Sequence, residues 1–253
     1  MVIQYPITKF VLCYNGGGGK ILASIGKLNF INSHRSSNNA FKFKTISGLG
    51  NWVKRFLGIG ALVEVFCFIS SLIQYQFLTQ GAHTQAGANS NDLRVMVVSV
   101  VDLFVFVITM ILFCIWVFRS NVNIRALGAQ GFKISPSWAV GFFFIPIFNL
   151  WKPYEAMNEV WWASHDMSSW QRRKNLESNI VSRWWFVWVL CLFTENASTQ
   201  LWEKAEEFSV MENLTLLDMV VSALSILSCY TAFVLVDQIT SIQTQLEARR
   251  DSL

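Results

Sequence analysis

Three stretches of this chain are long and apolar enough to cross a lipid bilayer. They occupy about residues 52–77, 95–118 and 216–236. Crossing the hydrocarbon core takes roughly 20 helical residues, and each stretch reaches that length. The chain of 253 residues is 53% hydrophobic and only 14% charged, which is much less charge than soluble domains carry. The sequence therefore predicts an all-α integral membrane protein.

Two shorter apolar stretches are ambiguous. Residues 180–194 are interrupted by Arg183, and residues 137–151 contain Pro146. A proline removes a backbone donor and disturbs a helix, and short apolar runs are more often re-entrant or interfacial than spanning. We expect residues 137–151 to enter the bilayer as a broken, re-entrant segment and residues 180–194 to cross it.

The distribution of charge favours the same arrangement, because Lys and Arg concentrate in cytoplasmic segments of membrane proteins. Residues 1–55 and 152–183 are basic, whereas residues 195–215 hold five Glu and one Lys. A full crossing by residues 137–151 would place the basic segment outside and the acidic one inside. The predicted topology has about four transmembrane helices and both termini in the cytoplasm. The plasma (inner) membrane is the expected location, with an organelle membrane as the alternative.

A further helix is predicted over residues 153–165, where Pro153 suits the first turn. Tyr154, Met157 and Trp161 recur at helical spacing, which indicates an amphipathic helix in the membrane interface. Trp side chains favour that boundary, so an aromatic anchor belt is expected there, and a site for a lipid headgroup or a quinone-like molecule is the alternative. The belt would consist of Trp138, Trp151, Trp161, Trp162, Trp170, Trp184, Trp185 and Trp188.

The membrane domain is expected to occupy residues 51–246, between a flexible N-terminal tail, 1–50, and a short C-terminal tail, 247–253. The first acidic residue is Glu64, so the N-terminal tail carries only positive charge and suits the surface of anionic lipid. An organelle transit peptide and a later translation start are alternatives for this tail.

Two acidic residues fall inside predicted spans. Glu64 lies near the middle of the first, and Asp102 lies at a similar depth in the second. Carboxylates within a membrane are costly and indicate function by default. The pair could bind a cation or share a proton. Alternatively, each is protonated and hydrogen-bonded to hydroxyls such as those of Ser70, Ser99 or Thr109.

No other constellation indicates chemistry. The five cysteines form no Cys-x-x-Cys pair and the three histidines are scattered, so neither a metal site nor a disulfide framework is expected. We expect no catalytic residues, no cofactor and no nucleic-acid partner.

The residues "NIRALGAQGFKISPSWAVGFFFIPIFNLWKPYEAMNEVWWAS", 123–164, resemble a family of multi-pass membrane proteins grouped as domain of unknown function 4328. The shared elements are R-A-L-G-A, S-P-x-W-A-V-G, P-x-x-N-L-W and K/R-P-Y, in that order. The resemblance implies an architecture but no activity. Its characteristic positions here are Arg125, Gly128, Pro136, Trp138, Pro146, Asn149, Trp151 and Pro153.

Two functions are compatible with these features. The first is a non-enzymatic membrane scaffold or partner subunit, working with a membrane-protein partner or as a homo-oligomer. The second is a small transporter or channel-like protein whose site includes the broken segment and the intramembrane carboxylates, because interrupted helices often form substrate sites.

Overall fold

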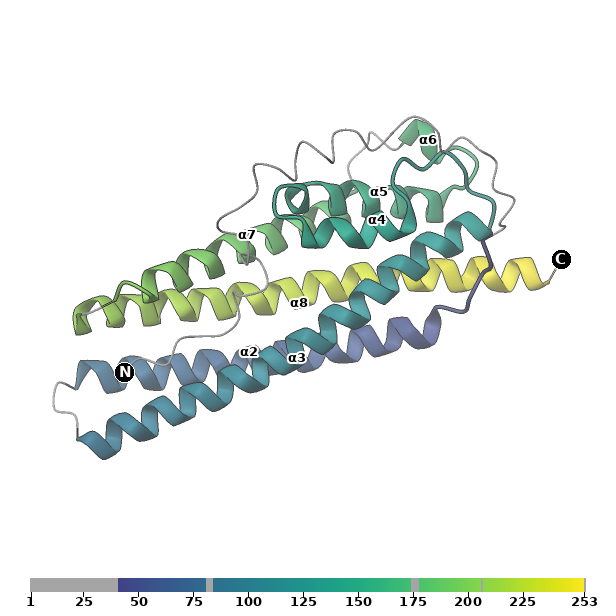
Figure 1. Ribbon diagram of the computed structural model, residues 1–253. Coiled ribbons are helices and arrows are strands. Elements are labelled where there is room, and N and C mark those ends of the chain that lie inside the picture. Colours follow the sequence, from purple (N-terminus) through teal and green to yellow (C-terminus); the bar gives the residue numbers. More distant parts are fainter. Residues whose placement is uncertain (1–40, 81–83, 174–177, 206, 253) are drawn as a thin grey trace.

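The computed structural model describes residues 41–80, 84–173, 178–205 and 207–252. Every regular element in these ranges is helical (Figure 1). In chain order the elements are α2 (Ser47–Thr79), α3 (Gln85–Ala126), α4 (Pro136–Gly141), the 3-10 turns η2 (Phe142–Phe144) and η3 (Phe148–Leu150), α5 (Lys152–His165), α6 (Trp170–Arg173), α7 (Asn179–Trp202) and α8 (Phe208–Asp251). The predicted all-helical fold is confirmed for this part of the chain.

Four long helices form an elongated bundle, and α4 to α6 pack together at one end of it (Figure 1). Helix α2 lies along both α3 and α8, and α7 lies along α8. Helices α2 and α7 end, and α3 and α8 begin, at one end of the bundle, whereas α2 and α7 begin, and α3 and α8 finish, toward the other (Figure 1). The short helices therefore share an end with the C-terminal part of α8.

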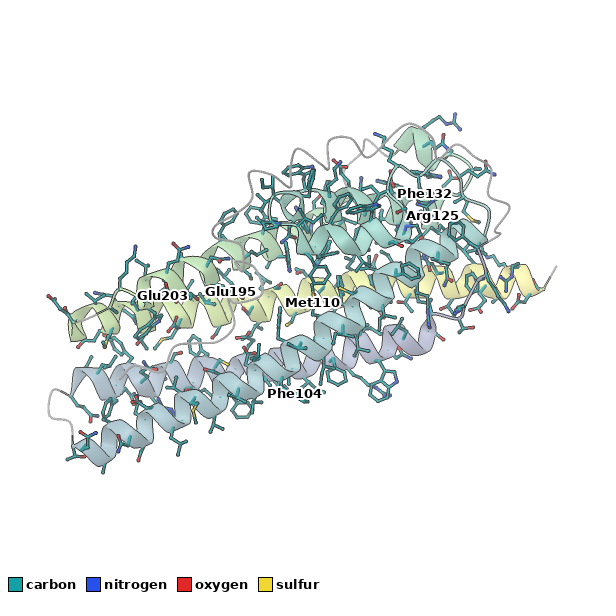
Figure 2. The ribbon with its side chains drawn as sticks, viewed as in Figure 1. Phe104, Met110, Arg125, Phe132, Glu195 and Glu203 are labelled. Carbon is teal, nitrogen blue, oxygen red and sulfur yellow. The ribbon has the colours of Figure 1, made fainter. Side chains whose placement is uncertain are left out.

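Three of these helices are long and apolar enough to span a membrane: α2, α3 and the part of α8 from Ser209 to Asp251. They contain the three predicted spans. At a rise of 1.5 Å per residue, α3 with its 42 residues is about 63 Å long and extends well beyond a hydrocarbon core of roughly 30 Å. Large apolar side chains such as those of Phe66 and Phe104 are exposed, at 63% and 68%, as contact with lipid requires. Figure 2 labels Phe104 on α3.

The predicted fourth span, 180–194, lies inside α7, which is a continuous helix of 24 residues. It is not among the three helices that are apolar enough for a span. The count of four transmembrane helices therefore stays a prediction.

The segment from 137 to 151 is broken, as Pro146 suggested. Helix α4 ends at Gly141, and the two 3-10 turns follow on either side of Pro146. Phe144 and Ile147 beside the break are exposed, at 54% and 69%. A broken backbone with outward apolar side chains is compatible with entry into a bilayer, but the re-entrant path itself stays a prediction.

Helix α5 begins at Lys152, one residue before the predicted start, and ends at His165 as expected. Its surroundings differ from those of an amphipathic helix lying in an interface. Asn158 and Glu159, on its polar side, are 7% and 6% exposed. Because α5 is packed against α3, α4, α7 and α8, its polar side is enclosed by protein as well as its apolar side.

The expected tryptophan belt is only partly present. Trp138 and Trp151 are exposed, at 54% and 40%, and are available to an interface. Four of the eight are instead buried and belong to the hydrophobic core: Trp161, Trp170, Trp184 and Trp185. These large side chains pack between helices instead, because a buried aromatic ring removes a large apolar area from solvent.

The described part of the N-terminal tail, 41–50, is attached to the bundle. The backbone N–H of Lys44 donates to Asn123 Oδ1 at 3.0 Å, and Asn123 Nδ2 donates to the Lys44 carbonyl at 2.8 Å. Helix α2 then begins at Ser47. Residues 1–40 of the predicted tail lie outside the described residues. At the other end, α8 continues through most of the predicted C-terminal tail, to Asp251.

Candidate functional site

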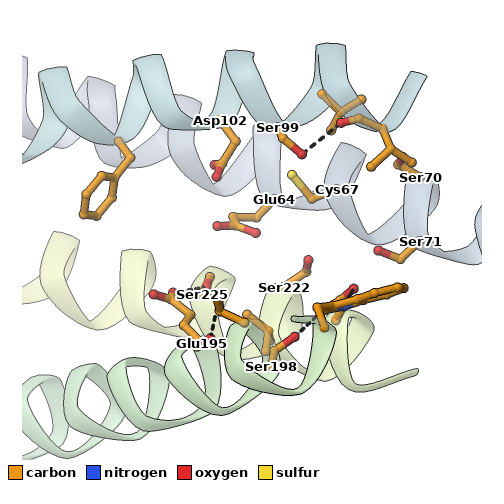
Figure 3. Close-up of a pocket in the computed structure, with 17 residues that line it drawn as sticks. Glu64, Cys67, Ser70, Ser71, Ser99, Asp102, Glu195, Ser198, Ser222 and Ser225 are labelled. Atoms are coloured by element: carbon orange, nitrogen blue, oxygen red, sulfur yellow. Dashed lines mark hydrogen bonds between the residues drawn. The ribbon is translucent and has the colours of Figure 1, made fainter. Parts of the chain in front are cut away.

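A cavity of about 120 Å³ lies between the four long helices. Each helix contributes one carboxylate to its lining: Glu64 from α2, Asp102 from α3, Glu195 from α7 and Asp218 from α8. Figure 3 shows the side chains of α2 and α3 on one side of the cavity and those of α7 and α8 on the other. Four acidic groups from distant parts of the sequence are thus brought to one place in the bundle.

The spacing of the lining residues follows the helical repeat. On α7 and on α8 the lining positions recur at i, i+3, i+4 and i+7, which is one face of a helix. These positions are Glu195, Ser198, Thr199 and Trp202 on α7, and Asp218, Val221, Ser222 and Ser225 on α8. Serine is frequent among them, and its small side chain leaves the space that the cavity occupies.

Asp218 is held by two donors from α7. Ser198 Oγ donates to its Oδ1 at 2.6 Å, and Trp202 Nε1 donates to its Oδ2 at 2.9 Å. The charge pattern predicts that residues 195–215 lie outside the membrane, beyond the span 180–194, but α7 continues through both Ser198 and Trp202. These two bonds join α7 to α8 beside the cavity.

On the opposite side, Glu64, Cys67 and Asp102 converge. Their carboxylate oxygens and the Cys67 Sγ lie within 4.8 Å of one another. Glu64 and Cys67 are three residues apart on α2 and so share a face, and α3 brings Asp102 to that face (Figure 3). Sequence alone left open whether Glu64 and Asp102 face each other; the structure places them together.

Of the three hydroxyls expected as partners for these carboxylates, two donate within their own helix and the third accepts from an arginine. Ser99 Oγ donates to the Val95 carbonyl at 2.8 Å, and Thr109 Oγ1 donates to the Val105 carbonyl at 2.7 Å, both within α3. Ser70 Oγ accepts a bond from Arg94 Nε at 3.3 Å. On the far side of the cavity, Ser225 Oγ lies 3.4 Å from Glu195 Oε1 and donates to it.

The lining residues include no Lys, Arg or His. Arg94, one residue before the lining residue Val95, donates to the side chain and the carbonyl of Ser70 at the edge of the cavity. Carboxylates withdrawn from water need protons, hydrogen bonds or cations to offset their desolvation. The cavity is therefore suited to a positively charged occupant.

The family-signature positions make contacts in and around α4 and α5, at one end of the bundle. Arg125 Nη2 donates to the Ile134 carbonyl at 2.5 Å, its Nε donates to Asn121 Oδ1 at 2.9 Å, and its guanidinium lies 4.2 Å from the centroid of the Phe132 ring. These contacts fix the loop between α3 and α4, in which Gly128 has a φ of 104°. Figure 2 shows Arg125 and Phe132 well away from Glu195.

The other signature residues shape the break before α5. Pro146 lies between the two 3-10 turns, and Pro153 lies in the first turn of α5. Asn149 is buried; its backbone N–H donates to the Ile145 carbonyl at 2.8 Å, and its Oδ1 has no hydrogen-bond partner in the described part of the chain. Trp138 stacks on Phe142, with 5.1 Å between the ring centroids.

None of the signature positions from Arg125 to Pro153 lines the cavity. The hypothesis of one site formed jointly by the broken segment and the carboxylates therefore needs correction. The structure separates the two, because α4 and the turns pack on the end of the bundle while the carboxylates lie along its length.

Three cavity residues were missed as candidates from the sequence: Cys67, Glu195 and Asp218. Cys67 lies within an apolar span without a second cysteine at metal-ligand spacing, and Asp218 lies near the start of the last span, so neither interrupts a span as Glu64 and Asp102 do. The signal that could have identified all three is the polar face recurring every three or four residues within otherwise apolar helices.

The sequence profile of the family DUF4328, described as a domain of unknown function, matches residues 80–241. That range is more than half of the chain, and it includes α3, α7 and most of α8. Neither the search of curated proteins nor the search of solved structures found a match.

Proposed function

Because the chain belongs to the DUF4328 family, whose description names no activity, we propose its function from the cavity: it binds a small cation inside a transmembrane helix bundle and moves it across the membrane. The observation that carries this proposal is the convergence of four carboxylates, one from each long helix, on a cavity with no basic lining residue. The proposal develops the alternative function that the sequence suggests, a small transporter, in place of the scaffold.

The energetics support a cation. An intramembrane carboxylate is expensive, and several close together also repel one another. Asp218 is stabilised by Ser198 and Trp202, and Glu64 by the hydroxyls of Ser222 and Ser225. Glu64 and Asp102 nevertheless lie close to each other on adjoining helices. A cation between them would offset the repulsion as well as the desolvation.

The arrangement of the helices supports a transmembrane path. If α7 also crosses the bilayer, four helices surround the carboxylates, and α3 and α8 begin on the same side. The α4 to α6 region then lies on the side where α2 begins and α8 ends, which the basic residues predict to be cytoplasmic. In this proposal the protein resides in the plasma (inner) membrane, and the basic tail contacts anionic lipid.

Flux through the reconstituted protein tests the proposal. The purified chain in liposomes should take up protons or a metal cation down an imposed gradient, read by a dye enclosed in the liposomes. Glu64→Gln and Asp102→Asn should reduce the initial rate at least about tenfold, because each removes one charge from a cavity in which charge is poorly screened. Glu155→Gln, which changes an exposed carboxylate on α5, is the matched control and should retain the rate.

An absence of flux for every cation tried, from protein that is folded and correctly inserted, would contradict transport. Equal rates in Glu64→Gln, Asp102→Asn and the unaltered chain would show that the flux does not use this cavity.

A membrane scaffold or partner subunit is the second candidate, and one observation favours it. Exposed apolar side chains gather around the broken segment, namely Trp138, Phe144, Ile147, Phe148 and Trp151. They suit contact with lipid, with another membrane protein or with a second copy of this chain. Crosslinking in the membrane from Ile147, through a photoreactive residue placed there, would separate these: a discrete protein adduct supports the scaffold, and lipid adducts alone oppose it.

A further inference from the structure

The chemistry of the convergent donors on α2 and α3 narrows the class of cation, and this step rests on the proposed function. A cluster of carboxylates alone would accept protons or hard cations equally. Here one of three donors is a thiol, and Glu64, Cys67 and Asp102 bring all three donor atoms within 4.8 Å of one another. The donor set thus mixes two oxygens with one sulfur.

The distances suit a small metal ion after slight movement of the side chains. With metal–oxygen bonds of about 2.0–2.2 Å and metal–sulfur bonds of about 2.3 Å, donors in a tetrahedral site lie roughly 3.3–3.7 Å apart. Closing from at most 4.8 Å to that separation requires shifts of about 1 Å or less in each side chain. Rotation about side-chain torsions supplies such shifts without moving α2 or α3.

The thiol selects the kind of metal. Mg²⁺ and Ca²⁺ prefer oxygen ligands, whereas thiolates favour zinc and similar transition metals. A bound divalent metal also deprotonates a coordinating thiol, so Cys67 would act as a thiolate in the occupied site. Two carboxylates and one thiolate carry three negative charges, so the site with a divalent ion bound has a net charge of −1.

The site would keep an open position. Structural zinc sites usually have four Cys or His ligands, but this cavity offers three convergent donors and no His. Glu195 faces them from α7, across the cavity (Figure 3). An incomplete set, with a further carboxylate opposite, suits an ion that is bound and released.

We propose that Glu64, Cys67 and Asp102 bind a divalent transition-metal ion of the zinc class, and that Glu195 is the group to which the ion passes as it crosses the cavity. Zinc should compete with cobalt for this site, and magnesium should not.

Cobalt spectroscopy on the purified protein tests the assignment without any transport measurement. Co²⁺ added to detergent-solubilised protein should produce the near-ultraviolet charge-transfer band that marks a cobalt–thiolate bond, and equimolar Zn²⁺ should remove that band. Cys67→Ser should lose the band, and Glu64→Gln should weaken Co²⁺ binding at least about tenfold, since even outer-shell partners of a metal contribute 10–100-fold. Cys114→Ser is the matched control, because Cys114 is a thiol on α3 that does not line the cavity; it should keep the band.

The outcomes separate this inference from the proposed function. A thiolate band that depends on Cys67, in protein that shows no flux, would uphold the metal site and overturn transport. Flux of protons or of a hard cation, in protein that gives no band, would uphold transport and overturn the zinc-class assignment. A band that persists in Cys67→Ser would also overturn the assignment. Circular dichroism establishes that each variant is folded.

Discussion

Gly50 of α2 lies so close to Thr240 of α8 that a Cβ on the glycine would be 2.5 Å from Thr240 Oγ1 and 2.7 Å from its Cγ2. The same Thr240 hydroxyl accepts a hydrogen bond from Trp116 Nε1 of α3 at 3.0 Å, and Trp116 is fully buried. Three long helices therefore meet at one contact, in which the glycine allows the close approach and the threonine hydroxyl is already committed.

Replacing this glycine should loosen the bundle. Gly50→Ala should destabilise the protein by about 1–3 kcal/mol, the usual cost of overpacking a tight contact. The measurement is the thermal unfolding midpoint in detergent. Gly58→Ala is the matched control on the same helix: nothing lies within 4 Å of its added Cβ, so the better helix former should leave the midpoint unchanged or raise it.

A second variant distinguishes the contact from a general effect of the substitution. Adding Thr240→Ser to Gly50→Ala removes the Cγ2 methyl while keeping the hydroxyl for Trp116. The double variant should regain part of the lost stability. A midpoint for Gly50→Ala equal to that of Gly58→Ala would contradict the contact.

The ion pair between Lys54 and Asp237 should set how α2 and α8 align. Lys54 Nζ lies 2.7 Å from Asp237 Oδ1, with the two side chains 21% and 49% exposed. Asp237→Asn should cost at most about 1 kcal/mol, because partly exposed pairs contribute little. Lys54→Glu should cost more, since it faces Asp237 with a like charge.

Exchanging both charges should restore the pair. The double variant Lys54→Glu/Asp237→Lys is expected to unfold at a higher temperature than Lys54→Glu alone, with a gain that shrinks at high salt. A double variant no more stable than the single one would mean that the pair does not hold the two helices.

The cavity shows what the sequence could and could not predict. Glu64 and Asp102 were identified because they interrupt clearly apolar helices, and arithmetic on helical rise placed them at one depth. Glu195 was missed because the hydropathy falls after Thr194, so the chain there was interpreted as a loop. The helix continues nonetheless, since a residue need not be apolar to favour helix: Glu195 and Gln200 are both polar and both good helix formers.

In the region of α4 to α6, the predictions from sequence were incomplete for a different reason. The break at Pro146 was predictable from the restricted backbone of proline. The burial of Trp161, Trp184 and Glu159 was not, because it depends on which helices surround α5. A single sequence shows which face of each helix is apolar but not which helix packs against that face. Tryptophans suit both a membrane interface and a helix–helix contact, so the sequence could not show which of them would be buried.

Thiol labelling in intact cells should decide the topology. With the native cysteines replaced, a membrane-impermeant maleimide should label Lys204→Cys, after α7, and leave Ser168→Cys, between α5 and α6, unlabelled. Both positions are exposed, so access depends on the side of the membrane and not on burial. The expected result follows from a crossing by α7 together with a return of residues 137–151 to the cytoplasmic side.

The reverse labelling pattern would mean that residues 137–151 cross the bilayer and that the basic segment lies outside. Labelling of both positions would place α7 on the outer surface. Permeabilised cells provide the control, since both cysteines should then react.

Glu159 should make stability depend on pH. Burial raises the pKa of this carboxyl group above its ordinary value, although Lys133 N–H, 3.1 Å from Oε1, and the Arg125 charge act in the opposite direction. The folded protein therefore binds the proton more tightly than the unfolded chain does. Its contribution to stability is fully present below the pKa of the unfolded chain and is lost as pH rises toward the folded value.

Glu159→Gln removes this dependence while keeping an oxygen that can accept from Lys133. The unfolding midpoint of the variant, relative to the unaltered protein, should increase as pH rises from about 4, near the pKa of an unperturbed glutamate, to 7. Thermal unfolding in detergent across that range measures the difference. A difference that stays constant with pH would show that Glu159 binds its proton equally in both states, and a difference that falls would show that Arg125 outweighs the burial.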